Sequence, residues 1–349
     1  MQNTSVHTNF AKYKVLDKEA YSNVLSQSSV HCKSGKWNIP GDKYEHFLKN
    51  INEELVKNPN KQMHFLEKPS SECNMLKIDL DLRFKATDEE LKNRTNLNRR
   101  YNDEYIELFA NSIAETIKDI IDIKESYTIF IQEKKHPRLT NDNTNTIKDG
   151  IHIIIPKLVM NNSALHYLRD RLVENEEIKE ITKSIDNITK IGDVIDKRII
   201  YPNAWYIYGC GKPEDHGNYY KVSKIFKVTH KNDTVSLRSI QSTKTITEYI
   251  SLFSNFGKKH NVEYLIDLEE QEENDDKYSK EKSFNRREQL SLIHNFTQNQ
   301  TNFRRISSLT ASEIKALLNC LNKSRADDYE DWRKIGICLY NMDDRNYDT

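Results

Sequence analysis

Two aspartates, Asp79 and Asp81, stand two positions apart where apolar and charged residues alternate over residues 75–84. Alternation with period two predicts a half-buried strand, and residues at i and i+2 project from one face with Cα atoms about 7 Å apart. Carboxylates at that spacing could share a pair of divalent ions, and oxygen-only ligands suit Mg²⁺ or Mn²⁺. Such ions stabilise the charge that builds up in phosphoryl transfer. The alternative is a strand whose charged face is only solvated.

Lys148 and His152 lie on either side of Gly150, where an apolar run over residues 151–155 predicts a buried strand that Pro156 ends. Both side chains could hold a triphosphate, and a glycine between them lets the backbone approach a ligand closely. The alternative for His152 is a core histidine that hydrogen bonds satisfy.

Asp196 follows an apolar residue, and Lys212 follows a Gly-Cys-Gly turn. A third carboxylate would complete a three-carboxylate metal site, and a lysine behind glycines could reach a phosphate. Between them, residues 199–208 are rich in aromatic and β-branched residues, which predicts a strand. The alternative is a surface hairpin with a solvated lysine.

The elements that position these residues can be predicted from periodicity. Apolar residues recur every three or four positions over residues 44–51, 102–123 and 164–178, which predicts helices. Residues 127–131 predict a strand, and a basic loop over residues 132–149 leads into the next one. Because strands and helices alternate irregularly, we expect an α+β fold and not a doubly wound sheet.

A stretch of dense charge with few apolar residues, residues 268–289, predicts a solvated linker. Apolar residues return at helical spacing after it and predict a small helical module. We therefore divide the chain into a catalytic domain over residues 1–265, a charged linker over residues 266–300 and the helical module over residues 301–349.

The charge balance bears on nucleic-acid binding. Lys and Arg number 53, as do Asp and Glu, so the whole chain has no net field to attract DNA, and a binding surface must be a local basic patch. Candidates for contacts to template phosphates, which would weaken with salt, are Lys134, Lys135 and Arg138, with the pair Arg99 and Arg100. The alternative is ordinary solvated surface.

Cysteine usage and hydropathy exclude several classes of protein. The five cysteines are scattered without C-x-x-C spacing, which predicts neither a disulfide framework nor a zinc module. No apolar run approaches the roughly 20 residues that span a bilayer, and the N-terminus lacks the features of a signal peptide. We expect an intracellular protein that is not secreted and has no membrane partner.

The order of the three groups resembles the archaeo-eukaryotic primase superfamily, with an Asp-x-Asp strand, then a strand carrying a histidine, then an apolar residue followed by Asp. The resemblance is greatest to the primase-helicases of large DNA viruses, including poxviruses. It covers residues 75–212 and 310–342. It implies a primase catalytic domain with an RNA-recognition-motif-like sheet and flanking helices, followed by the helical primase C-terminal module.

The resemblance also implies two sets of site residues. The catalytic metal ligands would be Asp79, Asp81 and Asp196, holding Mg²⁺ or Mn²⁺, and the nucleotide-binding residues Arg83, Lys148, His152 and Lys212. The sequence departs from the family pattern at two positions, since Tyr206 stands where the family has Arg and Gly150 where it usually has Ser. Both departures concern nucleotide contacts more than the metal site.

By resemblance, the function is template-directed transfer from ribo- or deoxynucleoside triphosphates on single-stranded DNA during viral replication, in the host cytoplasm or at a viral replication site. No G-x-x-x-x-G-K-[ST] loop occurs, so helicase activity belongs to a region or partner outside this chain. The alternatives are a non-catalytic DNA-binding or helicase-loading module and a two-metal nuclease. Nucleotide incorporation separates the first reading from both, and substrate degradation separates the two alternatives.

Overall fold

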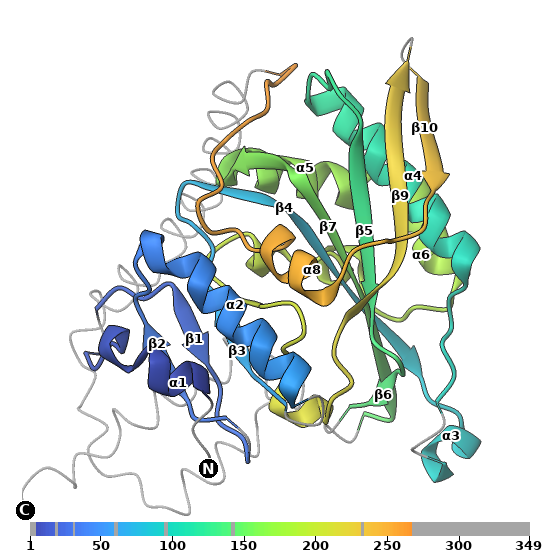
Figure 1. Ribbon diagram of the computed structural model, residues 1–349. Helices are drawn as coiled ribbons and strands as arrows, with labels where there is room; N and C mark the ends of the chain where they lie inside the picture. The colour runs from blue at the N-terminus through green and yellow to red at the C-terminus, as the bar shows by residue number, and fades with distance from the viewer. Residues whose placement is uncertain are drawn as a thin grey trace, which may run out of the picture. The chain divides into compact units, whose positions relative to one another are not determined.

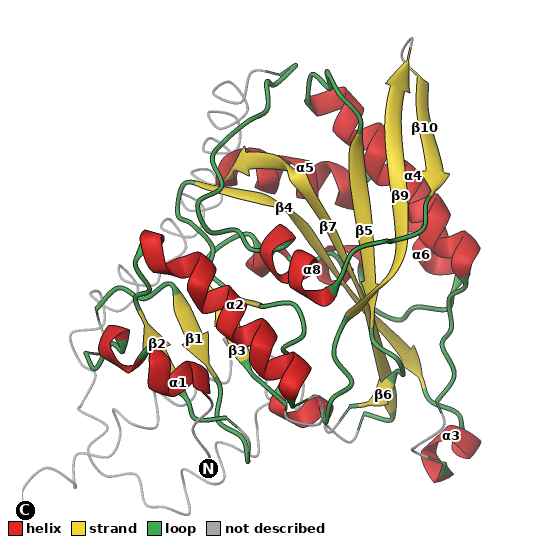
Figure 2. Cartoon of the chain, in the orientation of Figure 1, coloured by secondary structure: helices red, strands yellow, loops and turns green. Residues whose placement is uncertain are grey.

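The fold is described for residues 5–17, 20–30, 32–58, 62–93, 97–140, 144–231 and 234–266 of a computed structural model (Figure 1). The predicted linker from residue 267 onward and the predicted helical module lie outside these residues, and the division into domains stays a prediction. Within the described ranges the α+β prediction is confirmed, since antiparallel strands form two sheets and helices pack on them (Figure 2).

The larger sheet carries most of the described core. Its strands lie in the order β10-β9-β5-β7-β4, with β6 also paired to β7, and all pairs are antiparallel. The bounds are β4 (Cys73–Lys85), β5 (Tyr127–Glu133), β6 (Arg138–Leu139), β7 (Thr146–Asn161), β9 (Lys221–Lys231) and β10 (Thr234–Ser239). Residues 76–85 of β4 pair with residues 146–155 of β7 without interruption, which fixes the side chains that face each other.

Helices cover one face of this sheet. They are α4 (Asp103–Ile120), α5 (Asn162–Glu174) and α6 (Glu176–Ser184). Alternate residues of β4 join their core, namely Leu76, Ile78, Leu80, Leu82 and Phe84. Burying one such side chain contributes about 1.5–3 kcal/mol, and a slip of one residue would expose them all. The core therefore fixes the register and turns the alternating charged residues of β4 to the opposite face.

A smaller sheet, in the order β2-β1-β3-β8, joins the N-terminal region to a strand from much later in the chain. Its strands are β1 (Val24–Ser26), β2 (Gly35–Trp37), β3 (Phe65–Glu67) and β8 (Trp205–Tyr206), and α1 (Ser5–Asn9) and α2 (Gly41–Lys57) share its core. The helix predicted around residues 44–51 is confirmed as part of α2. Because β8 follows Asp196, the smaller sheet anchors the segment after that acid.

The shorter described elements connect these layers. They are α3 (Asp88–Lys92), α7 (Ile191–Val194), α8 (Ile246–Leu252) and the 3₁₀ helices η1 (Ala11–Tyr13), η2 (Lys197–Ile199) and η3 (Pro213–Asp215). None of the described helices is long and apolar enough to cross a membrane.

The prediction that Pro156 ends its strand is wrong, because β7 continues to Asn161. The ladder has an irregularity there: Leu76 pairs with Ile155, whereas Met75 pairs with Val159. Residues 156–158 therefore have no ladder partner on β4, and a proline is tolerated where no ladder hydrogen bond is required.

Three other predicted boundaries differ from the structure. The helix over residues 164–178 is two helices, because the Asn175 side chain accepts a hydrogen bond from Ile178 and starts α6. The strand over residues 199–208 is reduced to Trp205–Tyr206, since 3₁₀ and turn conformations precede it. The loop over residues 132–149 ends early, because pairing with β4 extends β7 back to Thr146.

Candidate active site

The face of the larger sheet opposite the helical core carries the predicted site residues. On β4 the row of side chains consists of Lys77, Asp79, Asp81 and Arg83. Across the ladder, the pairs are Asp79 with His152, Asp81 with Gly150 and Arg83 with Lys148. Antiparallel pairing thus makes neighbours of the first two predicted groups, which are far apart in the sequence.

The third predicted acid, Asp196, lies next to the same part of β4, at the outer edge of the sheet. Ile195 forms a bridge with Leu80, and the Asp196 N–H donates to the Asp79 carbonyl oxygen at 3.1 Å. The Asp196 carboxylate accepts hydrogen bonds from the backbone N–H and the guanidinium of Arg198, at 3.0 and 3.1 Å. The structure therefore brings all three acids to one edge of the sheet, with Asp79 in the middle.

The surroundings of Asp79 disfavour the charged form of its carboxyl group. Its Oδ1 is buried and has no hydrogen-bond partner among the described residues, and His152 Nε2 lies 3.5 Å from it. Burial, followed by the charge of Asp81, raises the pKa of Asp79 to about 7, against the opposing effect of Lys148. A positive charge beside Oδ1 would relieve both causes.

The donor set fits a divalent ion in its chemistry. The three acids offer carboxylate oxygens only, as Mg²⁺ and Mn²⁺ prefer, and one of these oxygens lacks a partner. No three His, Cys, Asp or Glu side chains in the described ranges are already gathered as a metal shell. In this structure Asp81 Oδ2 accepts from Lys148 Nζ at 2.7 Å and Asp196 from Arg198, and a bound ion would have to replace these contacts.

His152 is enclosed by aromatic rings. Its imidazole stacks on Tyr220 with centroids 3.4 Å apart and planes 19° apart, and lies 4.2 Å from the Trp205 ring. Burial first, and then Lys134 and other nearby lysines, lower the pKa of His152 well below its ordinary value. The ring is therefore neutral at physiological pH and can donate a hydrogen bond from a fixed position.

Lysines converge on this histidine from several elements. The ammonium groups of Lys77, Lys134, Lys148 and Lys212 all disfavour its protonation. Residues next to the smaller sheet hold Gly211, the residue before Lys212. His64 Nδ1 lies 2.6 Å from the Gly211 carbonyl oxygen, and the Gly211 N–H donates to the Met63 carbonyl oxygen. Cations gathered around a neutral donor are suited to a ligand with several negative charges.

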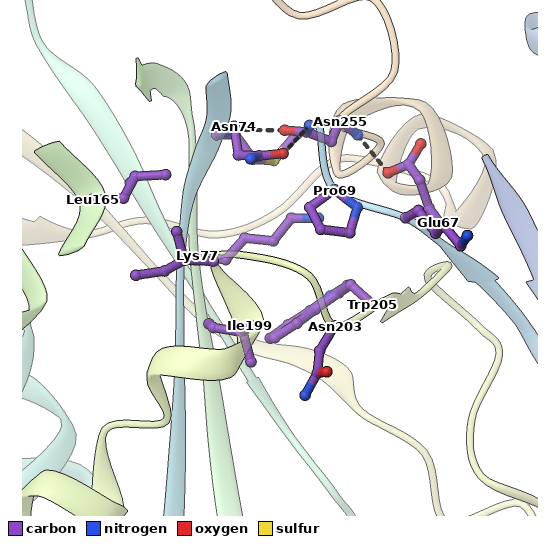
Figure 3. Close-up of a pocket in the computed structure, with 12 residues that line it drawn as sticks. Glu67, Pro69, Asn74, Lys77, Leu165, Ile199, Asn203, Trp205 and Asn255 are labelled. Carbon is purple, nitrogen blue, oxygen red and sulfur yellow. Dashed lines mark hydrogen bonds between the residues drawn. The ribbon is translucent and has the colours of Figure 1, made fainter. Parts of the chain in front are cut away.

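Lys77 was not predicted as a site residue, and it borders the small pocket that Figure 3 shows. Its side chain extends from β4 into this pocket, with Nζ 5.4 Å from the centre of the Trp205 ring. Burial lowers the pKa of Lys77. Across the pocket, Asn255 donates to Asn74 at 2.5 Å and, through its backbone, to Glu67 at 2.6 Å.

Two groups from elsewhere in the chain lie so close to Gly150 that a larger residue would not fit without a shift, and the sequence does not reveal this. A Cβ at this position would overlap the Tyr220 hydroxyl oxygen and lie 3.0 Å from the Leu80 carbonyl oxygen. We predict that Gly150→Ala lowers the free energy of unfolding by about 1–3 kcal/mol, as overpacking does. Adding Tyr220→Phe should recover part of the loss, because it removes the overlapping oxygen. Urea unfolding of both variants measures this, and an equal loss in both would contradict it.

Two of the three predicted DNA-binding residues make ion pairs within the protein, and their binding to DNA stays a prediction. Lys134 donates to the buried Asp215 at 2.7 Å, and Arg138 lies 3.8 Å from the same carboxylate. Lys135 is exposed. These contacts attach the loop that carries Lys134 and Arg138 to η3 next to Lys212.

The second group of basic candidates, Arg99 and Arg100, also forms ion pairs within the protein. Arg99 binds Asp149 at 2.9 Å and Glu133 at 2.5 Å, and it donates to the Lys134 carbonyl oxygen at 2.6 Å. Arg100 binds Glu90 at 2.7 Å. The carboxylates bound by Arg99 belong to the ends of β5 and β7, so this arginine supports the strands that carry the site.

Sequence reasoning missed the two rings that hold His152. Neither Trp205 nor Tyr220 was predicted as a site residue, and their contacts with His152 join separate parts of the chain. The aromatic composition of residues 199–208 was the available signal for Trp205, whereas for Tyr220 the sequence offers none.

Comparison with known proteins identifies the family. Residues 26–226, more than half of the chain, match the family described as the C962R protein N-terminal AEP domain, where AEP denotes archaeo-eukaryotic primase. The chain belongs to this family. The match includes the three acids, Lys148, His152 and Lys212, and it confirms the predicted primase resemblance. Residues 314–349 match a second family, Primase C terminal 2 (PriCT-2), within the segment predicted as a helical primase module.

Viral proteins are among the relatives of this primase-family chain. It is 24% identical over 359 residues to L207/L206 of Acanthamoeba polyphaga mimivirus, covering 96% of the chain and 34% of that protein. It is 25% identical over 337 residues to 184R of Invertebrate iridescent virus 6, covering 90% of the chain and 33% of that protein. Both relatives carry provisional helicase names. The chain thus spans about a third of the length of the curated relatives it matches.

Proposed function

We propose that the chain is a DNA primase-polymerase, a metal-dependent nucleotidyltransferase that joins nucleoside triphosphates on a single-stranded DNA template. One observation carries the proposal: three carboxylates on one sheet edge lie directly beside a neutral histidine and convergent lysines. Carboxylates alone would serve a nuclease equally well, but a nuclease has no need of a triphosphate grip. Membership of the primase family supports the same choice.

Asp79, Asp81 and Asp196 are the residues that would hold Mg²⁺ or Mn²⁺. Two bound ions supply positive charge that activates a 3′ hydroxyl and clamps the triphosphate. Asp79 would be the central ligand, because its backbone oxygen accepts the N–H of Asp196 and thereby joins the two chain segments that carry the acids. Lys148, which neutralises Asp81 in this structure, would then be free to bind a phosphate.

His152, Lys148 and Lys212 would bind the phosphates of the nucleotide. A neutral imidazole donates a hydrogen bond without adding a fixed charge, while the two ammonium groups offset charge on the phosphate oxygens. The Tyr220 stack and the Trp205 contact prevent the imidazole from turning away. No covalent intermediate with the protein is required.

The wider setting is inferred from the relatives. Since the chain matches only part of longer viral proteins with helicase names, we propose that it acts in viral DNA replication together with a helicase region or partner outside this chain. We place it inside the infected cell, in the cytoplasm or at a viral replication site.

The proposal predicts that the chain incorporates labelled nucleotides on single-stranded DNA with Mg²⁺ or Mn²⁺, that a chelator abolishes incorporation, and that added metal restores it. Product length on a denaturing gel measures this. Metal-dependent shortening of the DNA without extension would establish the nuclease instead. DNA binding without either reaction would establish the non-catalytic loading module.

A further inference from the structure

An open cleft of about 670 Å³ adjoins the acids on the outer side of β4, and neither His152 nor Lys212 lines it. Asp81 and Asp196 lie at the cleft, together with four cations, Arg83, Lys190, Lys197 and Arg198. This volume lies within the roughly 300–1000 Å³ that is usual for ligand sites. The charges that line the cleft, and not its size, therefore identify the occupant.

The outer wall of the cleft is a chain segment fastened to β4 at both ends. At one end the Ile188 N–H donates to the Arg83 carbonyl oxygen at 2.9 Å, and at the other the Asp196 N–H donates to Asp79. Arg169 of α5 adds hydrogen bonds to the Ile195 carbonyl oxygen at 3.0 Å. Lys190 and Lys197 are thus carried by a braced segment rather than a free loop.

Three of the four cations that line the cleft form no ion pair with the described residues. Arg198 is paired with Asp196, whereas Arg83, Lys190 and Lys197 have no ion-pair partner in the part of the chain that the structure describes. One exposed carboxylate, Asp193, also lines the cleft. An exposed apolar side chain, Ile188 at 59% exposure, stands beside them. Charge and apolar surface together suit a phosphate backbone with its attached sugars and bases.

We propose that this cleft binds the sugar–phosphate backbone of the nucleic-acid strand whose 3′ end is extended. The inference rests on the proposed function. In transfer of a nucleotide, the attacking and leaving oxygens lie on opposite sides of the phosphorus. Since the triphosphate grip lies on the β7 side of the acids, the 3′ end must arrive from the other side, which is where the cleft lies. Arg83 is thereby assigned to this nucleic-acid strand and not to the triphosphate.

The test is the affinity of the whole chain for a fluorescent single-stranded oligonucleotide, measured by anisotropy over a range of salt concentrations without divalent metal. The double variant Lys190→Ala, Lys197→Ala should bind about tenfold more weakly at low salt, with a slope of log K against log salt shallower by about 1.4. Lys190→Arg, Lys197→Arg should retain most of the affinity, because the charges are kept.

The matched control is Lys227→Ala, Lys231→Ala, which removes the same charge from exposed positions on β9, toward the opposite edge of the sheet. The control should bind within twofold of the unchanged chain. Equal losses in the two alanine variants, or no binding by the unchanged chain, would overturn the proposal. Displacement of the oligonucleotide by a nucleoside triphosphate at constant ionic strength would also overturn it, since the cleft would then be the triphosphate site.

Two further binding measurements complete the experiment. RNA of equal length should show the same dependence on Lys190 and Lys197, because the phosphate backbone is common to both polymers; a loss confined to DNA would contradict backbone recognition. The variant Asp79→Ala, Asp81→Ala should bind the oligonucleotide at least as tightly as the unchanged chain, because it removes negative charge at and beside the cleft. If no chain incorporates nucleotides but the cleft variant still loses binding, the cleft stands and the proposed function fails. If incorporation occurs and the cleft variant binds like the control, only the cleft assignment fails.

Discussion

Replacing Asp79 with asparagine should lower nucleotide incorporation about a thousandfold or more, because a metal clamp contributes several kcal/mol and each 1.36 kcal/mol is a factor of ten in rate. The same change should leave the thermal unfolding temperature unchanged or raise it. Asp79 is a buried carboxylate beside two other acids, and an oxygen of it lacks a partner among the described residues. Asparagine keeps the shape and removes the unfavourable charge.

Single-turnover primer extension and a thermal melt of the same preparation measure these two effects. The matched control is Asp119→Asn, which removes one carboxylate from an exposed position of α4 and should change neither. Loss of activity together with loss of stability would mean that Asp79 is a structural residue. Full activity of Asp79→Asn would remove it from the metal site.

Replacing Arg99 with alanine should have the largest effect on stability, a loss of about 3–5 kcal/mol in the free energy of unfolding. The change leaves two carboxylates without their cation, Asp149 with 1% of its side chain exposed and Glu133 with 8%. Tyr101 and Ser223 still donate to Glu133, but neither brings a charge. Arg99→Lys should recover part of the loss, because it keeps the charge without the planar fork.

The loss in Arg99→Ala should also depend on pH. Burial raises the pKa of Asp149, and Arg99 opposes that rise, so removing Arg99 raises this pKa further. A carboxyl group with a raised pKa is most compatible with folding when protonated. The deficit relative to the unchanged chain should therefore be smallest near about pH 4 and grow toward pH 7.

Chemical unfolding at several pH values measures this deficit, and Arg100→Ala is the matched control. Arg100 binds Glu90 nearer the surface, with a third of its side chain exposed, and exposed pairs contribute only about 0–1 kcal/mol. Equal effects of the two substitutions would contradict the supporting role of Arg99. A deficit that grows toward acid pH would contradict the role of the buried carboxylates.

The sequence was sufficient where a local pattern decides the structure. Alternation around Asp79 and Asp81 predicted β4, and apolar spacing predicted α2 and α4, because each of these buries a single face. The irregular alternation of elements likewise predicted the α+β class. The order of the acids, the histidine and the lysine was enough to predict the family.

The sequence was insufficient where partners come from distant segments. Lys134 and Arg138 have the composition of a DNA-binding patch, but Asp215, far along the chain, binds both. Nothing local marks that carboxylate as their partner. Similarly, Lys190 and Lys197 belong to no motif, and they line a cleft only because Ile188 and Asp196 bond to the edge of β4.

The central claim is nucleotidyl transfer, and the most direct measurement counts both products of one reaction. Pyrophosphate released and nucleotide incorporated are measured together on single-stranded DNA with Mg²⁺ or Mn²⁺, for the unchanged chain and for Asp79→Ala, Asp81→Ala. We expect one pyrophosphate for each nucleotide added by the unchanged chain, and neither product from the double variant. Nucleotide incorporation that survives in the double variant, or none from the unchanged chain while it still binds DNA, would contradict the account.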